Sequence, residues 1–269
     1  MKRFHAAALA GLALVTGACS SVPTPLAPGV RGSVGWPSFG VLTSADATLP
    51  ERGSGFRRLR PWAQTNHATA RMVATLTAAA AQVAGPDDPP LIIGDISGPG
   101  GGHLPGHHSH RSGRDVDLLY FYTTPGGAPV EAPGFLRVGP DGLGRLDGTS
   151  EFVRFDVARN WRLVRALLDS PHARPQWIFV VTHLEARLIE YARALDEPPD
   201  LIWRAENVLH QPGDSAPHDD HFHLRIDCGD DEITGCLNGP PLWPWWPPSA
   251  ALPDAGANES ISWLDDLTP

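Results

Sequence analysis

Twelve residues, Gly106–Asp117, constrain the fold of this 269-residue chain more than any other segment. Their sequence, GHHSHRSGRDVD, contains three histidines and two aspartates and leads directly into an apolar segment. A second such stretch, HDDHFH, lies about a hundred residues further on, at His218–His223. Imidazole and carboxylate groups are standard zinc ligands, and a catalytic zinc needs three of them from the protein. We therefore expect a fold in which the two stretches meet.

The second stretch predicts a strand from His221 to Ile226. Alternate residues of a strand share a face, so His221 and His223 would point the same way. One of these imidazoles could bind a metal while the other accepts a proton from metal-bound water. Asp115 and Asp117 share a face in the same manner.

Spacing in the first stretch leaves two pairs of candidate ligands. His108 and Asp115 have the same separation as His110 and Asp117, so either pair could bind the metal. Gly113 favours the second pair, because glycine tolerates the positive φ that a turn between His110 and Asp117 would need. His108 and Asp115 would then be bystanders or outer partners of the ligands.

A competing interpretation is that the clustered histidines are solvated or bind metal adventitiously. Asp219 and Asp220 would then be ordinary loop carboxylates. Neither cluster is conclusive alone, but the two together favour a metal site.

The composition is globular, with 42% hydrophobic and 19% charged residues. The formal net charge of −9 argues against a nucleic-acid partner, which requires a basic face to neutralise phosphates. Glycine and proline number 28 each, which predicts short elements and long loops.

The N-terminus resembles an export signal over residues 1–19. Lys2 and Arg3 precede an apolar run, Ala6–Val15, that is too short to span a membrane as a helix. Small residues just before Cys19 favour lipoprotein processing, in which Cys19 becomes the lipidated N-terminus. Cleavage by ordinary signal peptidase is the alternative. Both predict export, and the first adds a lipid anchor to the membrane.

Cys228 and Cys236 remain as a pair if Cys19 is lipidated. A turn-rich loop separates them, and an oxidising compartment would allow a disulfide. The alternatives are two free thiols or a zinc-binding pair, although no second Cys or His pair flanks them.

Periodicity predicts an α+β fold in which a small antiparallel sheet carries the zinc site, flanked by helices and long loops. The expected domain spans residues 36–240, after a linker at 20–35 and before a Trp/Pro-rich acidic tail at 241–269. A loop is expected from about residue 198 to 217. The expected helices are Trp62–Val83, Asp156–Leu168 and Leu184–Leu195, and the expected strands are Leu91–Ile93, Val116–Tyr122, Trp177–Val181 and His221–Ile226.

Ile93–Asp95, the glycine-rich loop after it and Gly106–Asp117 together resemble the penicillin-insensitive murein endopeptidases. These belong to a wider group of zinc peptidases that includes lysostaphin-type enzymes, D-Ala-D-Ala carboxypeptidases and the hedgehog domain. The group's pattern is a His, a Gly three residues later and an Asp seven residues after the His. In this chain the pattern selects His110, Gly113 and Asp117, and the group's closing His-x-His is His221 and His223.

The resemblance implies a role for each histidine. It makes His110, Asp117 and His223 the zinc ligands and His221 the general base. His107 matches a further histidine near the metal, and His218 would stabilise the oxyanion. The chain departs from the better-known members in having His108 where a small residue is usual, in having fewer cysteines, and in its tail.

The implied function is that of a periplasmic zinc metallopeptidase that hydrolyses peptide cross-links of peptidoglycan, with D-alanyl–meso-diaminopimelate as the expected bond. Its partners would be peptidoglycan stem peptides. One alternative is a D,D-carboxypeptidase that trims terminal D-Ala. Another is a zinc-containing cell-wall-binding module without turnover, although His221 as a candidate base argues against it. No serine nucleophile is needed, so β-lactams would not acylate such an enzyme.

Overall fold

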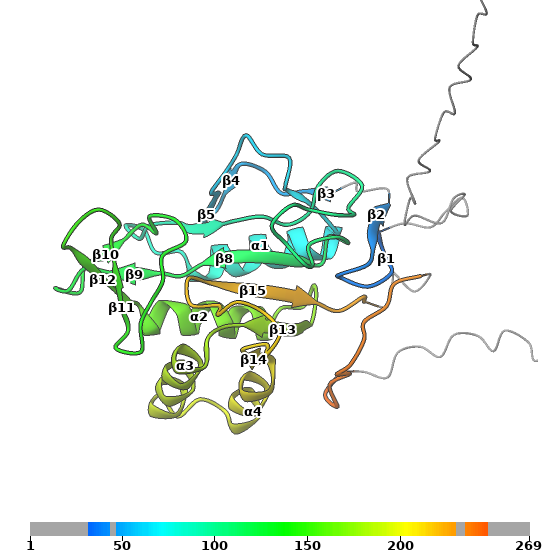
Figure 1. Ribbon diagram of the computed structural model, residues 1–269. Coiled ribbons are helices and arrows are strands. Elements are labelled where there is room, and N and C mark those ends of the chain that lie inside the picture. Colours follow the sequence, from blue (N-terminus) through cyan, green and yellow to red (C-terminus); the bar gives the residue numbers. More distant parts are fainter. Residues whose placement is uncertain (1–31, 44–46, 230–234, 247–269) are drawn as a thin grey trace, which may run out of the picture.

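The computed structural model describes residues 32–43, 47–229 and 235–246 of the chain (Figure 1). The predicted signal peptide, Cys19 and most of the predicted linker lie outside the described residues, as does the tail beyond Trp246. Within the described part, no helix is long and apolar enough to cross a membrane.

A seven-stranded sheet forms the centre of the molecule, in the order β14-β13-β15-β8-β7-β5-β4. Its inner strands pair antiparallel, whereas β13 with β14 and β5 with β7 pair parallel. The sheet is therefore larger than expected and mixed. Its strands are β4 (Arg52–Gly53), β5 (Phe56–Arg58), β7 (Leu91–Ile93), β8 (Asp115–Leu119), β13 (Pro175–Phe179), β14 (Leu209–His210) and β15 (His221–Ile226).

Three smaller sheets surround the central one. They are β1 (Gly32–Val34) with β2 (Val41–Thr43), β3 (Ala47–Thr48) with β6 (His67–Ala68), and a four-stranded sheet of β10 (Pro129–Val130), β9 (Tyr122–Thr123), β12 (Phe152–Phe155) and β11 (Leu143–Arg145). Periodicity did not indicate most of these strands, because strands of two to four residues are too short to show alternation.

Helix α1 (Ala70–Val83) begins eight residues later than the predicted helix from Trp62. Thr69 caps it, since its hydroxyl accepts a 3.2 Å hydrogen bond from the Met72 amide. The residues before Thr69 instead form β6 and a turn. Helix α2 (Val157–Leu168) begins after Asp156, whose carboxylate caps it by accepting from the Arg159 amide at 3.0 Å.

Helix α3 (Thr182–Ala194) agrees closely with expectation, but α4 (Pro199–Val208) occupies a segment predicted to be a loop. The prolines at 198 and 199 suggested a helix end. They instead precede and open a helix, where proline is tolerated because the first amides need no intrahelical acceptor.

One face of the central sheet packs against helices, which Figure 1 shows with α1 and α2 behind β8 and β15. The core contains the fully buried Val116 and Leu118 of β8 and Phe222 and Leu224 of β15. The four helices, mixed sheets and long loops of the described residues confirm the predicted α+β class. The alternate residues of β8 and β15 face the other side, where the histidines lie.

Candidate metal centre

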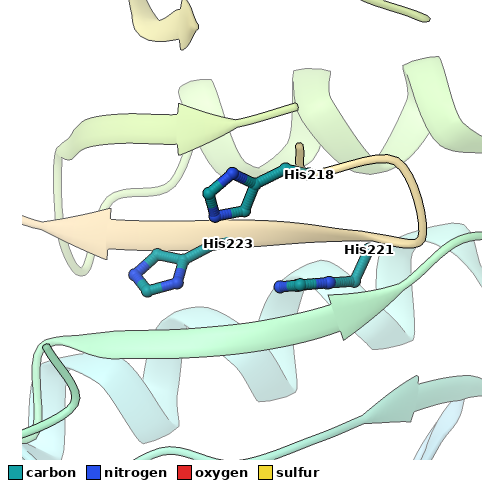
Figure 2. Close-up of side chains that lie close together, drawn as sticks. All are labelled: His218, His221 and His223. Atoms are coloured by element: carbon teal, nitrogen blue, oxygen red, sulfur yellow. The ribbon is translucent and has the colours of Figure 1, made fainter. Parts of the chain in front are cut away.

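Strands β8 and β15 bring the two histidine-containing stretches together. Their antiparallel register pairs His223 with Asp117 and Arg225 with Asp115. Paired residues point to the same face of a sheet, so these four side chains lie together opposite the core. Figure 2 shows the rings of His221 and His223 on one side of β15, with His218 entering from the preceding loop.

His110 reaches the same point from the loop before β8. Its backbone has φ = +63°, a conformation that non-glycine residues adopt rarely. The buried Ser97 hydroxyl stabilises this turn by donating to the His110 carbonyl at 2.6 Å and accepting from the Gly113 amide at 3.0 Å. Gly113 has φ = +72°, as the sequence predicted for a turn between His110 and Asp117.

Three side-chain atoms form a nearly equilateral triangle. His110 Nε2 lies 3.2 Å from Asp117 Oδ1, His223 Nδ1 lies 3.4 Å from the same oxygen, and the two nitrogens are 3.3 Å apart. Tetrahedral zinc with ligand bonds of about 2.0–2.1 Å separates its ligand atoms by roughly 3.3–3.4 Å. Asp117 Oδ1 is buried and makes no well-formed hydrogen bond with the described residues. The donor set therefore fits a tetrahedral cation.

Each histidine of the triangle has a second ring nitrogen that faces away from it. The hydrogen-bond partner of this nitrogen determines the tautomer. His110 Nδ1 lies 2.8 Å from the Ile96 carbonyl, an acceptor, so this nitrogen carries the proton. His223 Nε2 lies 2.8 Å from Asp115 Oδ1, which also accepts from Arg225 Nε at 2.7 Å. The nitrogens that face the triangle therefore present lone pairs, as metal ligands must.

Both buried aspartates are ionised. Burial opposes the charge of Asp115, but Arg225 and His223 outweigh it and hold the pKa of that carboxyl well below its ordinary value. Burial likewise opposes the charge of Asp117, and the neighbouring His110 and His221 hold its pKa well below the ordinary value. The centre therefore offers a cation the negative charge of Asp117, with Asp115 behind His223.

His221 lies beside the triangle. Its Nε2 is 3.3 Å from Asp117 Oδ1, and its Nδ1 donates a short hydrogen bond to Asp220. Burial disfavours protonation of the ring, but Asp117 and Asp220 outweigh it and raise the pKa of His221 to about 9. A cation bound to Asp117 would remove much of this effect, which leaves Asp220 as the partner that orients the ring.

His218 forms a second group with His221 and His223, in which one ring nitrogen of each lies within 4.8 Å of the others. Burial, and then the neighbouring His223 and His221, lower the pKa of His218 to about 3. Its ring is therefore neutral, with one N–H able to donate. Its Nδ1 is buried without a hydrogen-bond partner among the described residues.

His107 approaches the carboxylate oxygen of Asp117 that is not part of the triangle. Its Nδ1 is 3.9 Å from Asp117 Oδ2, and its Nε2 is 3.3 Å from Asp95 Oδ2. Asp95 also pairs with Arg60 and accepts from the Thr65 hydroxyl at 2.6 Å. His107, His110 and Asp117 form a further group of atoms that could hold a metal ion.

Two comparisons with known proteins agree with this arrangement. Residues 33–131 match the family model described as penicillin-insensitive murein endopeptidase. A protein of Haemophilus influenzae named penicillin-insensitive murein endopeptidase is 26% identical over 253 residues, which cover 92% of this chain and 78% of that protein. The chain is therefore similar to the penicillin-insensitive murein endopeptidases, as its sequence motifs indicated.

The family match ends at residue 131, so it includes the loop and β8 but not β15. In this chain, the pairing of β15 with β8 brings His221 and His223 to the first stretch. The structure separates the two pairs that spacing left open, because His108 is exposed whereas His110 is only 1% exposed. Asp115 lies behind His223 rather than in the triangle.

The sequence interpretation gave no role to Asp95 and treated Asp220 as an ordinary loop carboxylate. Asp95 lies just beyond β7, and Asp220 directly precedes His221. Position next to a strand end or a candidate base was the available signal for both. Cys228 and Cys236 form the predicted disulfide, with an S–S distance of 2.11 Å.

Proposed function

We propose that this protein is a penicillin-insensitive murein endopeptidase, a zinc-dependent enzyme that hydrolyses peptide cross-links of peptidoglycan. The observation that carries the proposal is the triangle of His110 Nε2, Asp117 Oδ1 and His223 Nδ1, with His221 beside it. Three protein ligands with a neighbouring base are what metal-assisted peptide hydrolysis needs. Zinc, when bound, lowers the pKa of water toward neutrality and polarises a carbonyl oxygen.

His221 is the proposed general base. Its Nδ1–H donates to Asp220, so its Nε2 lone pair faces the centre and can take a proton from the attacking water. The same nitrogen can then return that proton to the leaving amine. Asp220 orients the ring and stabilises its protonated form.

His218 is the proposed oxyanion partner. The lowered pKa keeps its ring neutral, so it can donate one N–H bond without holding a charge in the resting site. A donor aimed at the developing oxyanion stabilises the transition state more than the substrate. His107 hydrogen-bonds with Asp95 and would help to hold Asp117 through the carboxylate oxygen outside the triangle.

The substrate bond is proposed to be D-alanyl–meso-diaminopimelate. Support comes from the family and from the name of the Haemophilus influenzae relative. An enzyme that acts on peptidoglycan works outside the cytoplasm, and we propose the periplasm. Lipidation of Cys19 stays a prediction, to be checked by mass spectrometry of the mature N-terminus.

The test uses purified cross-linked muropeptide dimers and the full-length protein. Zinc-loaded protein should convert dimers into monomers, and prior removal of metal with a chelator should abolish conversion until zinc is restored. Persistence of dimers with zinc-loaded protein would contradict the proposal. Release of D-Ala from pentapeptide monomers, with dimers left intact, would instead identify a D,D-carboxypeptidase.

A further inference from the structure

The sheet face that carries the metal centre continues into aromatic residues on β13. The register pairs Phe179 with His223 and Trp177 with Arg225, so both rings lie on the side of the metal centre. The Phe179 ring centroid is 5.3 Å from that of His223 and 5.4 Å from that of His218. Phe179 is only 9% exposed, so it links the metal centre to the more open ring of Trp177.

Four tryptophans extend this surface away from the centre, and we name them the tryptophan platform: Trp177, Trp203, Trp243 and Trp245. The Trp177 ring stacks on Phe179 with centroids 5.9 Å apart and meets the Trp243 ring edge-on at 5.3 Å. Trp243 and Trp245 lie nearly parallel, at 4.9 Å and 8°. Trp203 of α4 meets Trp245 at 4.8 Å.

Buried polar groups fix the segment that supplies Trp243 and Trp245. Gln176, only 1% exposed, donates through Nε2 to the carbonyls of Asn238 and Gly239 at 2.9 and 3.0 Å. The backbone carbonyl of Gln176 accepts from Trp243 Nε1 at 2.8 Å. In Figure 1 this segment, in darker orange than β15, begins beside β1 and descends on the side of α4. The rings are thus oriented before any ligand arrives, which lowers the entropic cost of binding.

The platform remains open to solvent despite these contacts. Trp203 is 47% exposed, and Trp177, Trp243 and Trp245 are partly exposed. Contiguous exposed aromatic rings indicate a binding surface more often than scattered ones do. Indole faces are electron-rich, and they attract the polarised C–H groups on the flat faces of sugar rings. A polymer of sugar rings, which presents such C–H faces repeatedly, therefore fits this surface.

We propose that the tryptophan platform binds the glycan strand of peptidoglycan beside the cross-link that the metal centre hydrolyses. This inference rests on the proposed function for the nature of the substrate. Stem peptides are attached to the sugar chain, so a surface for sugars must lie close to the site for the peptide. The platform from Trp177 to Trp203 supplies such a surface, and the buried Phe179 ring connects it to the metal centre.

Binding of peptide-free glycan strands, prepared by removing all stem peptides, tests the platform separately from catalysis. The full-length protein should bind these strands, with a change in tryptophan fluorescence. Trp203→Ala and Trp245→Ala should each weaken binding roughly tenfold, because each removes one partly exposed ring of the platform. Trp62→Ala is the matched control, since Trp62 is 80% exposed and lies in the loop between β5 and β6. Thermal unfolding of all three variants checks that they fold.

Absence of binding to the glycan strands, or equal binding by folded Trp203→Ala and Trp245→Ala variants, would overturn the inference. So would loss of self-association in these variants, which would show that the platform faces a second copy of the chain. Hydrolysis of a sugar-free peptide dimer by the unsubstituted protein reports on the proposed function alone. If the unsubstituted protein does not hydrolyse this dimer but still binds the glycan strands, the endopeptidase proposal is rejected and glycan binding by the platform is retained.

Discussion

His110, His223 and His221 each form a hydrogen bond through one ring nitrogen, and the other ring nitrogen faces Asp117. His110 relies on the Ile96 carbonyl, His223 on Asp115 and His221 on Asp220. These hydrogen bonds decide which nitrogen carries a proton, so residues outside the triangle control its chemistry.

Replacement of Asp220 by asparagine tests the support of His221. We expect kcat to fall roughly a hundredfold with little change in KM, because the ring loses the carboxylate that orients it and stabilises its protonated form. Steady-state kinetics on muropeptide dimers measures this effect. Asp219→Asn is the control, since the nearest cation to Asp219 is Arg137 at 3.9 Å. Equal kinetics for both variants would show that Asp220 does not act through His221.

Replacement of His110 by alanine tests the choice of ligand pair. Bound zinc at equimolar metal should fall by more than half and activity by at least roughly a hundredfold, because one corner of the triangle is lost. His108→Ala should retain both, since His108 is exposed and outside the triangle. Elemental analysis and dimer hydrolysis report the two quantities. Equal zinc loss in the two variants would make this ligand assignment wrong.

At the scale of elements, the turn from His110 to Gly113 connects the glycine-rich loop to β8. It packs against the start of α1, where the Thr69 amide donates to the Gly113 carbonyl at 3.1 Å. The geometry of one ligand therefore depends on a contact between a loop and a helix cap.

Gly113→Ala should destabilise the protein by about 1–3 kcal/mol, because alanine is strained at φ = +72°. Its Cβ would also lie 2.9 Å from the Leu42 methyl carbons and 3.0 Å from the Thr69 nitrogen. Denaturant unfolding measures the change. Gly98→Ala is the control, since a Cβ there meets nothing within 4 Å. Equal stability of the two variants would contradict the role given to this turn.

At the scale of the whole molecule, Asp227 joins elements that are far apart in sequence. It is fully buried and accepts from Arg71 of α1 at 2.9 Å and from Arg174, next to β13, at 2.7 Å. Burial opposes its charge, but Arg71 and Arg174 outweigh it and lower the pKa of Asp227. The stability that it supplies is therefore present above the unfolded-state pKa and is lost as pH falls through the lower folded-state pKa.

Asp227→Asn should lower the free energy of unfolding at neutral pH by roughly 2–3 kcal/mol, because two arginines lose their shared counter-charge. The difference from the unsubstituted protein should shrink as pH falls below about 4, where the Asp227 carboxyl of the unfolded chain begins to take up a proton. Unfolding curves across this range measure both effects. Asp214→Asn, at an exposed loop position, should change neither. A difference that stayed constant with pH would show that Asp227 acts by packing alone.

The sequence by itself determined much of this protein. Hydrophobic periodicity predicted α2, α3 and β15 closely, and the α+β class followed. The spacing of histidine and aspartate narrowed the first stretch to two pairs of candidate ligands, and Gly113 favoured His110 with Asp117. These are local properties, set by the period of an element or by the backbone freedom of one residue.

Only the tertiary structure decided the rest. The register of β8 against β15 set His223 opposite Asp117, and the loop after β7 turned His110 inward while His108 remained exposed. Asp95, Asp115 and Asp220 acquired partners that the linear chain did not reveal. Short strands and α4 escaped prediction because long-range pairing and packing stabilise them. A metal centre needs atoms a few ångströms apart, and only the pairing of strands distant in sequence can supply that proximity.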